Sequence, residues 1–141
     1  MKILSLLCLV LLTSNCAVNL KDIRHGSPNF TLSSELSAKT LANRIVYEST
    51  QETINNKIFR DWDPAKLVET EDGSQKLLIT FTGVHPLFMI SYPPIAVAEI
   101  KITPKTSGGS MLEYWGIDWS KKDKFIDLIQ KCASSQNAPG K

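Results

Sequence analysis

The chain has 141 residues, of which 43% are hydrophobic and 21% are charged. This length suits one compact domain and is too short for two separate cores. Sixteen Lys and Arg against fourteen Asp and Glu leave a formal charge of +2, far from the concentrated positive field of a nucleic-acid-binding protein. The composition therefore predicts a globular domain with no nucleic-acid partner.

The first residues have the pattern of an export signal. Met1 and Lys2 form a short basic start, and the ten residues from Ile3 to Leu12 are almost entirely apolar. A membrane-spanning helix needs about 20 apolar residues, so this run is too short to cross a bilayer. We assign residues 1–15 to a secretory signal peptide; the alternative is a buried strand or helix at the start of the chain.

Cys16 follows this apolar run after the small polar stretch of residues 13–15. The arrangement resembles the lipobox of bacterial lipoproteins, although Leu12 stands one place too early and Asn15 replaces the usual small residue before the cysteine. The resemblance implies a lipid attached to Cys16, which anchors the protein to a membrane. Ala17 after the cysteine implies the outer membrane, on its periplasmic face. The alternative is ordinary cleavage before Ala17, which predicts a secreted or periplasmic soluble protein.

Residues 16–32 contain Gly26 and Pro28 and show no sustained apolar period, so we predict a flexible tether. The sequon formed by Asn29, Phe30 and Thr31 leaves a eukaryotic secreted protein as a further alternative. Beyond the export region only Cys132 remains, so no disulfide is expected and the domain must be held by its own core.

From Ser34 onward, apolar residues recur at helical spacing. We predict a helix of about twenty residues, capped by Ser33 or Ser34 and ending at Asn55 and Asn56. Its apolar face takes Leu36, Leu41, Ala42, Ile45, Val46, Thr53 and Ile54, and its polar face takes Lys39, Asn43, Arg44, Glu48 and Glu52.

The period changes to two beyond Pro64, which predicts strands. Two hairpins are expected: Lys66–Thr70 with Lys76–Thr82, joined through an Asp-Gly turn, and Ile95–Thr103 with Met111–Ile117. A last helix from Lys121 to Ala133 precedes a disordered tail at 134–141. The fold class is therefore α+β in a single domain, residues 33–133. It comprises a long N-terminal helix, an antiparallel sheet of four or five strands and a C-terminal helix, with the helices on one face.

Catalytic signals are sparse in the sequence. The histidines are His25 and His85, and no HExxH, CxxC or GxSxG pattern occurs. We predict no catalytic residue, metal site or cofactor. Cys132 lies on the apolar stripe of the last helix and is expected in the core rather than in a nucleophilic pair with His85. A secreted hydrolase using the carboxylates of Asp61, Asp63 or Glu99 is the alternative function.

The best candidate for a contact surface is the apolar segment 83–94. Pro93 and Pro94 cannot donate to a strand ladder, so we predict a loop in which Phe88, Met89 and Tyr92 contact a protein partner; a fifth strand over 87–92 is the alternative. Lys121, Lys122 and Lys124 are expected to pair with Asp118 and Asp123, or else to contact anionic lipid or peptidoglycan. Together these features predict a membrane-anchored envelope lipoprotein that acts by binding. It is expected to be an assembly or structural component of the outer membrane, or an inhibitor of an exported enzyme.

Overall fold

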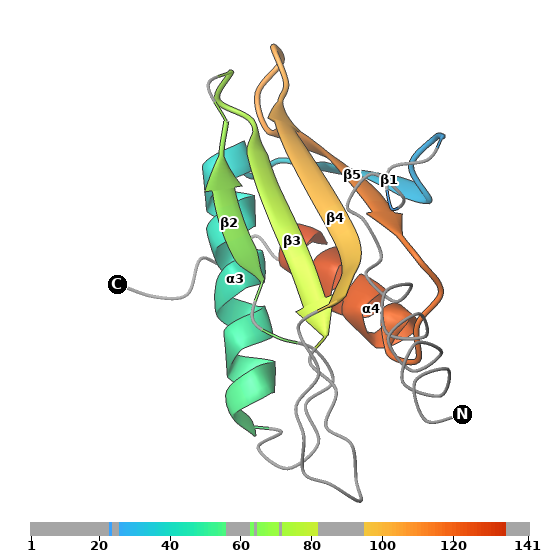
Figure 1. Cartoon of the computed structure of the whole chain (residues 1–141). Helices are drawn as coiled ribbons and strands as arrows, with labels where there is room; N and C mark the ends of the chain where they lie inside the picture. Colours follow the sequence, from blue (N-terminus) through green and yellow to red (C-terminus); the bar gives the residue numbers. More distant parts are fainter. Residues whose placement is uncertain are drawn as a thin grey trace, which may run out of the picture.

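Five strands form one antiparallel sheet, and two helices cover one of its faces (Figure 1). The computed structural model describes residues 23, 26–55, 63, 65–70, 72–81 and 95–134. The strand order across the sheet is β1-β5-β4-β3-β2. The elements are β1 (Phe30–Ser34), α3 (Ala38–Asn55), β2 (Lys66–Glu69), β3 (Gln75–Phe81), β4 (Ile95–Pro104), β5 (Ser110–Gly116) and α4 (Lys122–Ser134).

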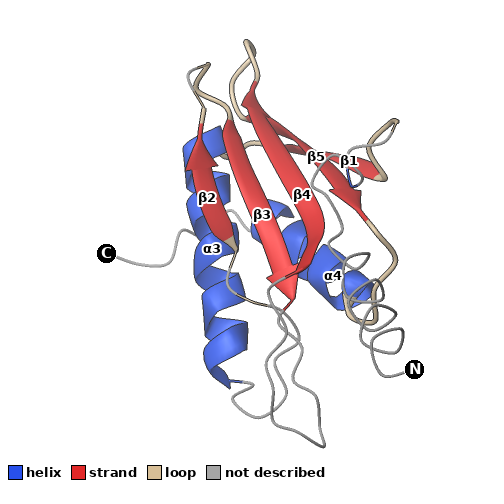
Figure 2. Ribbon diagram, in the orientation of Figure 1, coloured by secondary structure: helices blue, strands red, loops and turns tan. Residues whose placement is uncertain are grey.

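The α+β class, the two hairpins and the placement of both helices on one side of the sheet are confirmed (Figure 2). The β4–β5 turn needs glycine because Gly109 has a φ of +75°, and a Cβ at this position would meet the backbone carbonyl of Ser34. Alternating apolar residues predicted these strands correctly, as in β3, where Leu77 and Ile79 are fully buried between less buried neighbours.

Strand β1 corrects the predicted tether. Phe30–Ser34 pairs with β5 from Phe30↔Tyr114 to Ser34↔Ser110, so residues 30–32 belong to the sheet and precede the long helix. Phe30 and Leu32 pack against the core, while Thr31 and Ser33 are exposed. The prediction failed because a five-residue strand offers only two apolar positions, too few to stand out next to Gly26 and Pro28.

The start of α3 also differs from the expectation. Ser33 and Ser34 lie in β1, and the helix is capped by Ser37, whose Oγ accepts a hydrogen bond from the Thr40 amide at 3.2 Å. Ser34 is instead buried, and its hydroxyl donates to the carbonyl of Ala133 at 3.1 Å. The predicted end at Asn55 is confirmed.

The core lies between the helices and one face of the sheet. Its fully buried large side chains come from every central strand and from both helices: Leu41, Ile45, Leu77, Ile79, Ile100, Ile102, Leu112, Tyr114, Phe125 and Ile129. A bulge interrupts the β3–β4 register, because Ile79 pairs with Ala98 and Thr80 with Ala96. Val97 therefore packs into this core and Ala96 faces the other side, whereas strict alternation along β4 would place them the other way round.

Helices α3 and α4 are tied together by Arg44. We predicted this residue on the polar face, but its side chain is buried, and its Nη1 donates to the carbonyl of Cys132 at 3.1 Å. Ile54, predicted on the apolar face, is 50% exposed. Ser134, predicted in the tail, is the last residue of α4.

Candidate functional site

The predicted lipid-attachment and partner-binding residues lie outside the described residues. This applies to Cys16 and to Phe88, Met89 and Tyr92, so those assignments stay predictions. The structure does place both ends of the 82–94 segment: Phe81 at the end of β3 pairs with Ile95 at the start of β4. The segment therefore leaves and rejoins the sheet at one end.

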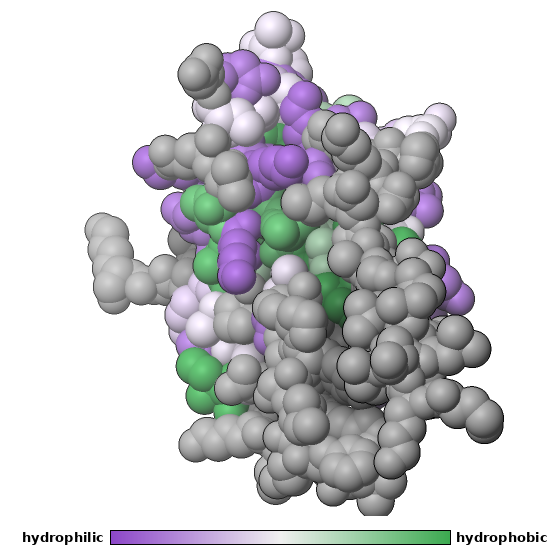
Figure 3. Space-filling model, in the orientation of Figure 1, coloured by the Kyte–Doolittle hydropathy of each residue, from purple (hydrophilic) through white to green (hydrophobic). Residues whose placement is uncertain are grey.

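The face of the sheet opposite the helices, here called the open face, carries a mixed set of side chains. Direct pairing places two rows of residues across the strands on this face. One row is Lys66, Leu78, Glu99 and Trp115; the next is Lys76, Lys101, Glu113 and Thr31. Figure 3 looks onto this face, where hydrophilic residues (purple) gather over its upper part beside hydrophobic ones (green).

Glu99 balances the charge of this face. Its carboxylate is only 2% exposed and pairs with Lys76 through Oε2 and Nζ at 3.3 Å. Lys76 and Lys101 are directly opposite each other, and like charges in that position destabilise a sheet. Glu99 offsets this repulsion, because its carboxylate pairs with the first of the two lysines. Its ion pair with Lys76 gives this carboxylate a structural partner, and its use in the alternative hydrolase stays a prediction.

The lower part of the open face holds a second apolar cluster, made of Ile23, Ala96 and Trp115. Ile23 is 5% exposed, and the partly buried Leu78 and Ile117 pack against the cluster. The Trp115 indole Nε1 donates to the carbonyl of Gly26 at 3.4 Å. The chain before β1, predicted to be a free tether, is therefore attached to the sheet at Ile23.

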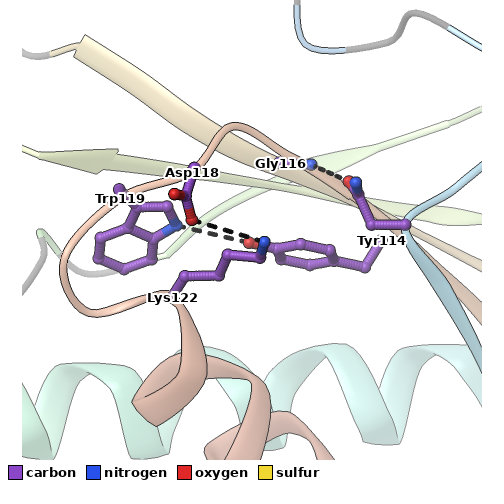
Figure 4. Close-up of polar contacts among 6 residues, drawn as sticks. Tyr114, Gly116, Asp118, Trp119 and Lys122 are labelled. Carbon is purple, nitrogen blue, oxygen red and sulfur yellow. Dashed lines mark hydrogen bonds and ion pairs between the residues drawn. The ribbon is translucent and has the colours of Figure 1, made fainter.

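Asn29 attaches the same segment a second time. Its backbone N–H donates to the Tyr114 carbonyl at 2.7 Å, and its side-chain Oδ1 accepts from the Gly116 backbone N–H at 2.6 Å. Figure 4 shows this part of β5 and the loop beyond it, with the Trp119 indole directed at the Tyr114 hydroxyl. Sequence reasoning missed Ile23 because an isolated apolar residue carries no periodicity. The alternation over residues 30–33 is the one sequence signal for β1, and with two apolar residues it is too short to identify a strand.

Cys132 and Asp63, two further candidates for catalysis, both contact the folded domain. Cys132 is confirmed as a core residue, and burial raises the pKa of its thiol to about 11, the opposite of what a nucleophile needs. Asp63 accepts a hydrogen bond from Thr80 Oγ1 at 3.0 Å, and its amide donates to the Thr80 carbonyl at 2.8 Å. Asp61 lies outside the described residues, so the hydrolase stays a prediction.

Two of the three lysines at the start of α4 have acidic partners in the structure. Lys122 pairs with Asp118 at 3.7 Å. Lys124 pairs at 3.3 Å with Glu52 of α3 rather than with Asp123. The second pair links the two helices across the surface of the domain, so Lys124 has a structural partner that the sequence did not indicate.

Neither a membrane span nor a metal site is found in the part of the chain that the structure describes. None of its helices is at once long enough and apolar enough to traverse a bilayer, and it holds no group of three His, Cys, Asp or Glu that could bind a metal ion. Comparisons with protein-family models, curated proteins and solved structures found no match.

Proposed function

We propose that this chain is a small envelope lipoprotein, anchored through Cys16 in the outer membrane, that acts by binding a protein partner. The observation that carries the proposal is the position of Cys16 directly after a basic start and a ten-residue apolar run. Several fatty chains on one cysteine hold a protein to a bilayer for long times, because each buried methylene contributes about 0.8 kcal/mol.

The folded part of the chain supports this role. Its core is closed by two helices on one face of the sheet, and its free cysteine, Cys132, is buried. A domain stabilised in this way needs no disulfide. Cys16, which lies outside both the core and the predicted signal peptide, is then free to carry the proposed lipid.

The binding part of the proposal depends on the apolar segment 83–94. Phe81 and Ile95, which flank it, pair at the end of the sheet where Ile23 packs against Ala96. Phe88, Met89 and Tyr92 thus belong to a segment that starts and finishes near the point where the amino-terminal chain meets the domain. As an outer-membrane component or as an inhibitor of an exported enzyme, the protein is expected to contact its partner through these three side chains.

Intact mass measurement tests the anchor. The wild-type protein from its native membrane fraction should begin at Cys16 and carry several hundred daltons of added mass or more, as expected of fatty chains. Cys16→Ala should lose this mass, and Cys132→Ala is the matched control that should keep it. An unmodified wild-type chain beginning at Ala17 would overturn the anchor.

Site-specific photocrosslinking tests the binding surface. A photoreactive residue at Phe88, Met89 or Tyr92 should give the same crosslinked protein in intact cells. Ser107, an exposed residue of the β4–β5 turn, is the control position and should not. Equal crosslinking from all four positions would remove the special role of the 83–94 segment.

A further inference from the structure

The chain that would connect the membrane to the domain is short. Ile23 is fixed on the open face, 5% exposed and packed against Ala96 and Trp115. It lies seven residues after Cys16. A fully extended chain spans at most about 3.6 Å per residue, so the anchored cysteine and Ile23 are never more than about 25 Å apart. The predicted tether of residues 16–32 would have reached roughly 60 Å.

This reach is smaller than the domain itself. A domain of about 120 residues has a radius of gyration near 14 Å and hence a diameter of about 35 Å. A chain that leaves the surface at Ile23 therefore cannot pass around the domain to a bilayer on the far side. The attachment at Ile23 limits which end of the sheet can face the membrane.

We infer that the bilayer lies against the end of the domain formed by Ile23, Ile117 and the loop from Ile117 to α4, and that the β4–β5 turn points away from it. This inference rests on the proposed acylation of Cys16. Ile23 packs beside Ala96 near the start of β4, and the turn with Ser107 follows the end of the same ten-residue strand. At about 3.3 Å per residue, that strand separates the two ends of the domain by roughly 30 Å. Figure 1 shows β4 running along the sheet between these two ends.

The contact of Ile23 is the part of the attachment that sets this orientation. If Ile23 and the neighbouring hydrogen bond between Gly26 and Trp115 were both released, the next fixed residue would be Asn29, held by Tyr114 and Gly116. The free chain from Cys16 would then be thirteen residues long and span up to about 47 Å, more than the width of the domain. A domain on that longer chain could rotate so that either of its ends faces the membrane.

The charges of the membrane-facing loop contribute little to this orientation. The membrane-facing loop and the first turns of α4 carry Lys121, Lys122 and Lys124 together with Asp118, Asp123 and Asp127, so the local charges cancel. We therefore expect the same orientation on neutral and anionic vesicles, with little dependence on salt, since exposed balanced charges are screened.

Energy transfer to the lipid surface tests the inference. Acylated protein carrying Ser120→Cys or Ser107→Cys is labelled with a donor dye and placed in phosphatidylcholine vesicles that contain a headgroup-labelled acceptor. Acylation occupies the Cys16 sulfur and Cys132 is buried, so each introduced thiol is the reactive one. Transfer should be at least about twofold more efficient from position 120 than from position 107, given separations of roughly 25 and 50 Å from the lipid surface.

Two changes should abolish this difference by separate routes. Ile23→Asp releases the chain from the open face. A ten-residue Gly-Ser insertion after Ala17 keeps Ile23 intact and extends the free chain to about 60 Å. Ile54→Asp, which alters a 50% exposed isoleucine on α3, is the matched control and should keep the difference.

The outcomes separate the inference from the function on which it rests. Equal transfer from the two positions in acylated, vesicle-bound protein would overturn the orientation and leave the anchor in place. A protein without added mass that stays off the vesicles would overturn both. The inference stands when the positional difference is present, persists in Ile54→Asp and is lost on lengthening the chain.

Discussion

Arg44 on α3 donates a hydrogen bond from Nη1 to the carbonyl of Cys132 on α4 at 3.1 Å. That carbonyl belongs to the last turn of α4, where carbonyl groups lack partners within the helix and the helix dipole is negative. The buried guanidinium of Arg44 therefore supplies a hydrogen-bond donor to a carbonyl at the end of α4 and joins the two helices. This contact explains why a charged residue occupies the interior of an otherwise apolar layer.

Replacing Arg44 by methionine should destabilise the domain by about 2 kcal/mol, because a hydrogen bond to a charged donor is lost and the Cys132 carbonyl stays buried. Urea unfolding followed by circular dichroism measures the change. Lys39→Met, at an exposed position of the same helix, should change the free energy of unfolding by less than about 0.5 kcal/mol. Equal effects of the two substitutions would contradict the assigned role of Arg44.

Gly116→Ala should destabilise the fold by about 1 to 3 kcal/mol through overpacking. A Cβ at this position would lie 2.7 Å from Cζ of Tyr114, a ring that is fully buried and has no room to move. Thermal unfolding measures the loss. In a Tyr114→Phe background the same substitution should cost less, since the hydroxyl that approaches residue 116 is gone. An unchanged cost in that background would assign the clash to the ring carbons of residue 114, which phenylalanine keeps, rather than to the hydroxyl.

The stability of the domain should fall at alkaline pH because of Cys132. Burial raises the pKa of this thiol from 9.0 to about 11 in the folded state. The unfolded chain then loses its thiol proton first, so the contribution is complete below pH 9 and is lost as pH rises towards 11. The linkage relation gives about 2 kcal/mol at pH 11. Burial also raises the pKa of Tyr114, which adds a loss in the same direction.

Comparing wild type with Cys132→Ala isolates the contribution of the thiol. The variant is less stable at pH 7, because a buried side chain has been shortened, but its unfolding free energy should decline less steeply between pH 9 and 11. If the unfolding free energies of the two proteins fall in parallel between pH 9 and 11, Cys132 does not cause the loss of stability at alkaline pH.

The β2–β3 turn should lose stability in acid because of Asp72. The Ser74 hydroxyl, the Thr70 hydroxyl and the Ser74 amide donate to this carboxylate and hold its pKa well below the usual value. The stabilisation is therefore present above the ordinary pKa near 4 and is lost as pH falls towards the folded value. Asp72→Asn should be less stable than wild type at pH 7, and urea unfolding should show this difference narrowing below pH 4. A constant difference would rule out ionisation as the cause.

The sequence by itself was enough to predict those helices and strands in which apolar residues recur regularly over many positions. The two hairpins and the last helix repeat their apolar residues often enough for the period to identify them, and Cys132 was placed in the core by its spacing from Phe125 and Ile129. The prediction of export and lipidation also rests on local signals, namely the basic start, the short apolar run and Cys16, and it stays a prediction.

Only the tertiary structure decided the features that depend on residues distant in the chain. β1 needs β5 as its partner, Arg44 is buried because α4 ends beside it, and Ile23 is fixed because Trp115 and Ala96 lie on the open face. A lone apolar or charged residue has no period, so its environment is set by the neighbours that folding brings to it. The number of residues that would separate a lipid-anchored Cys16 from the domain follows from one such contact.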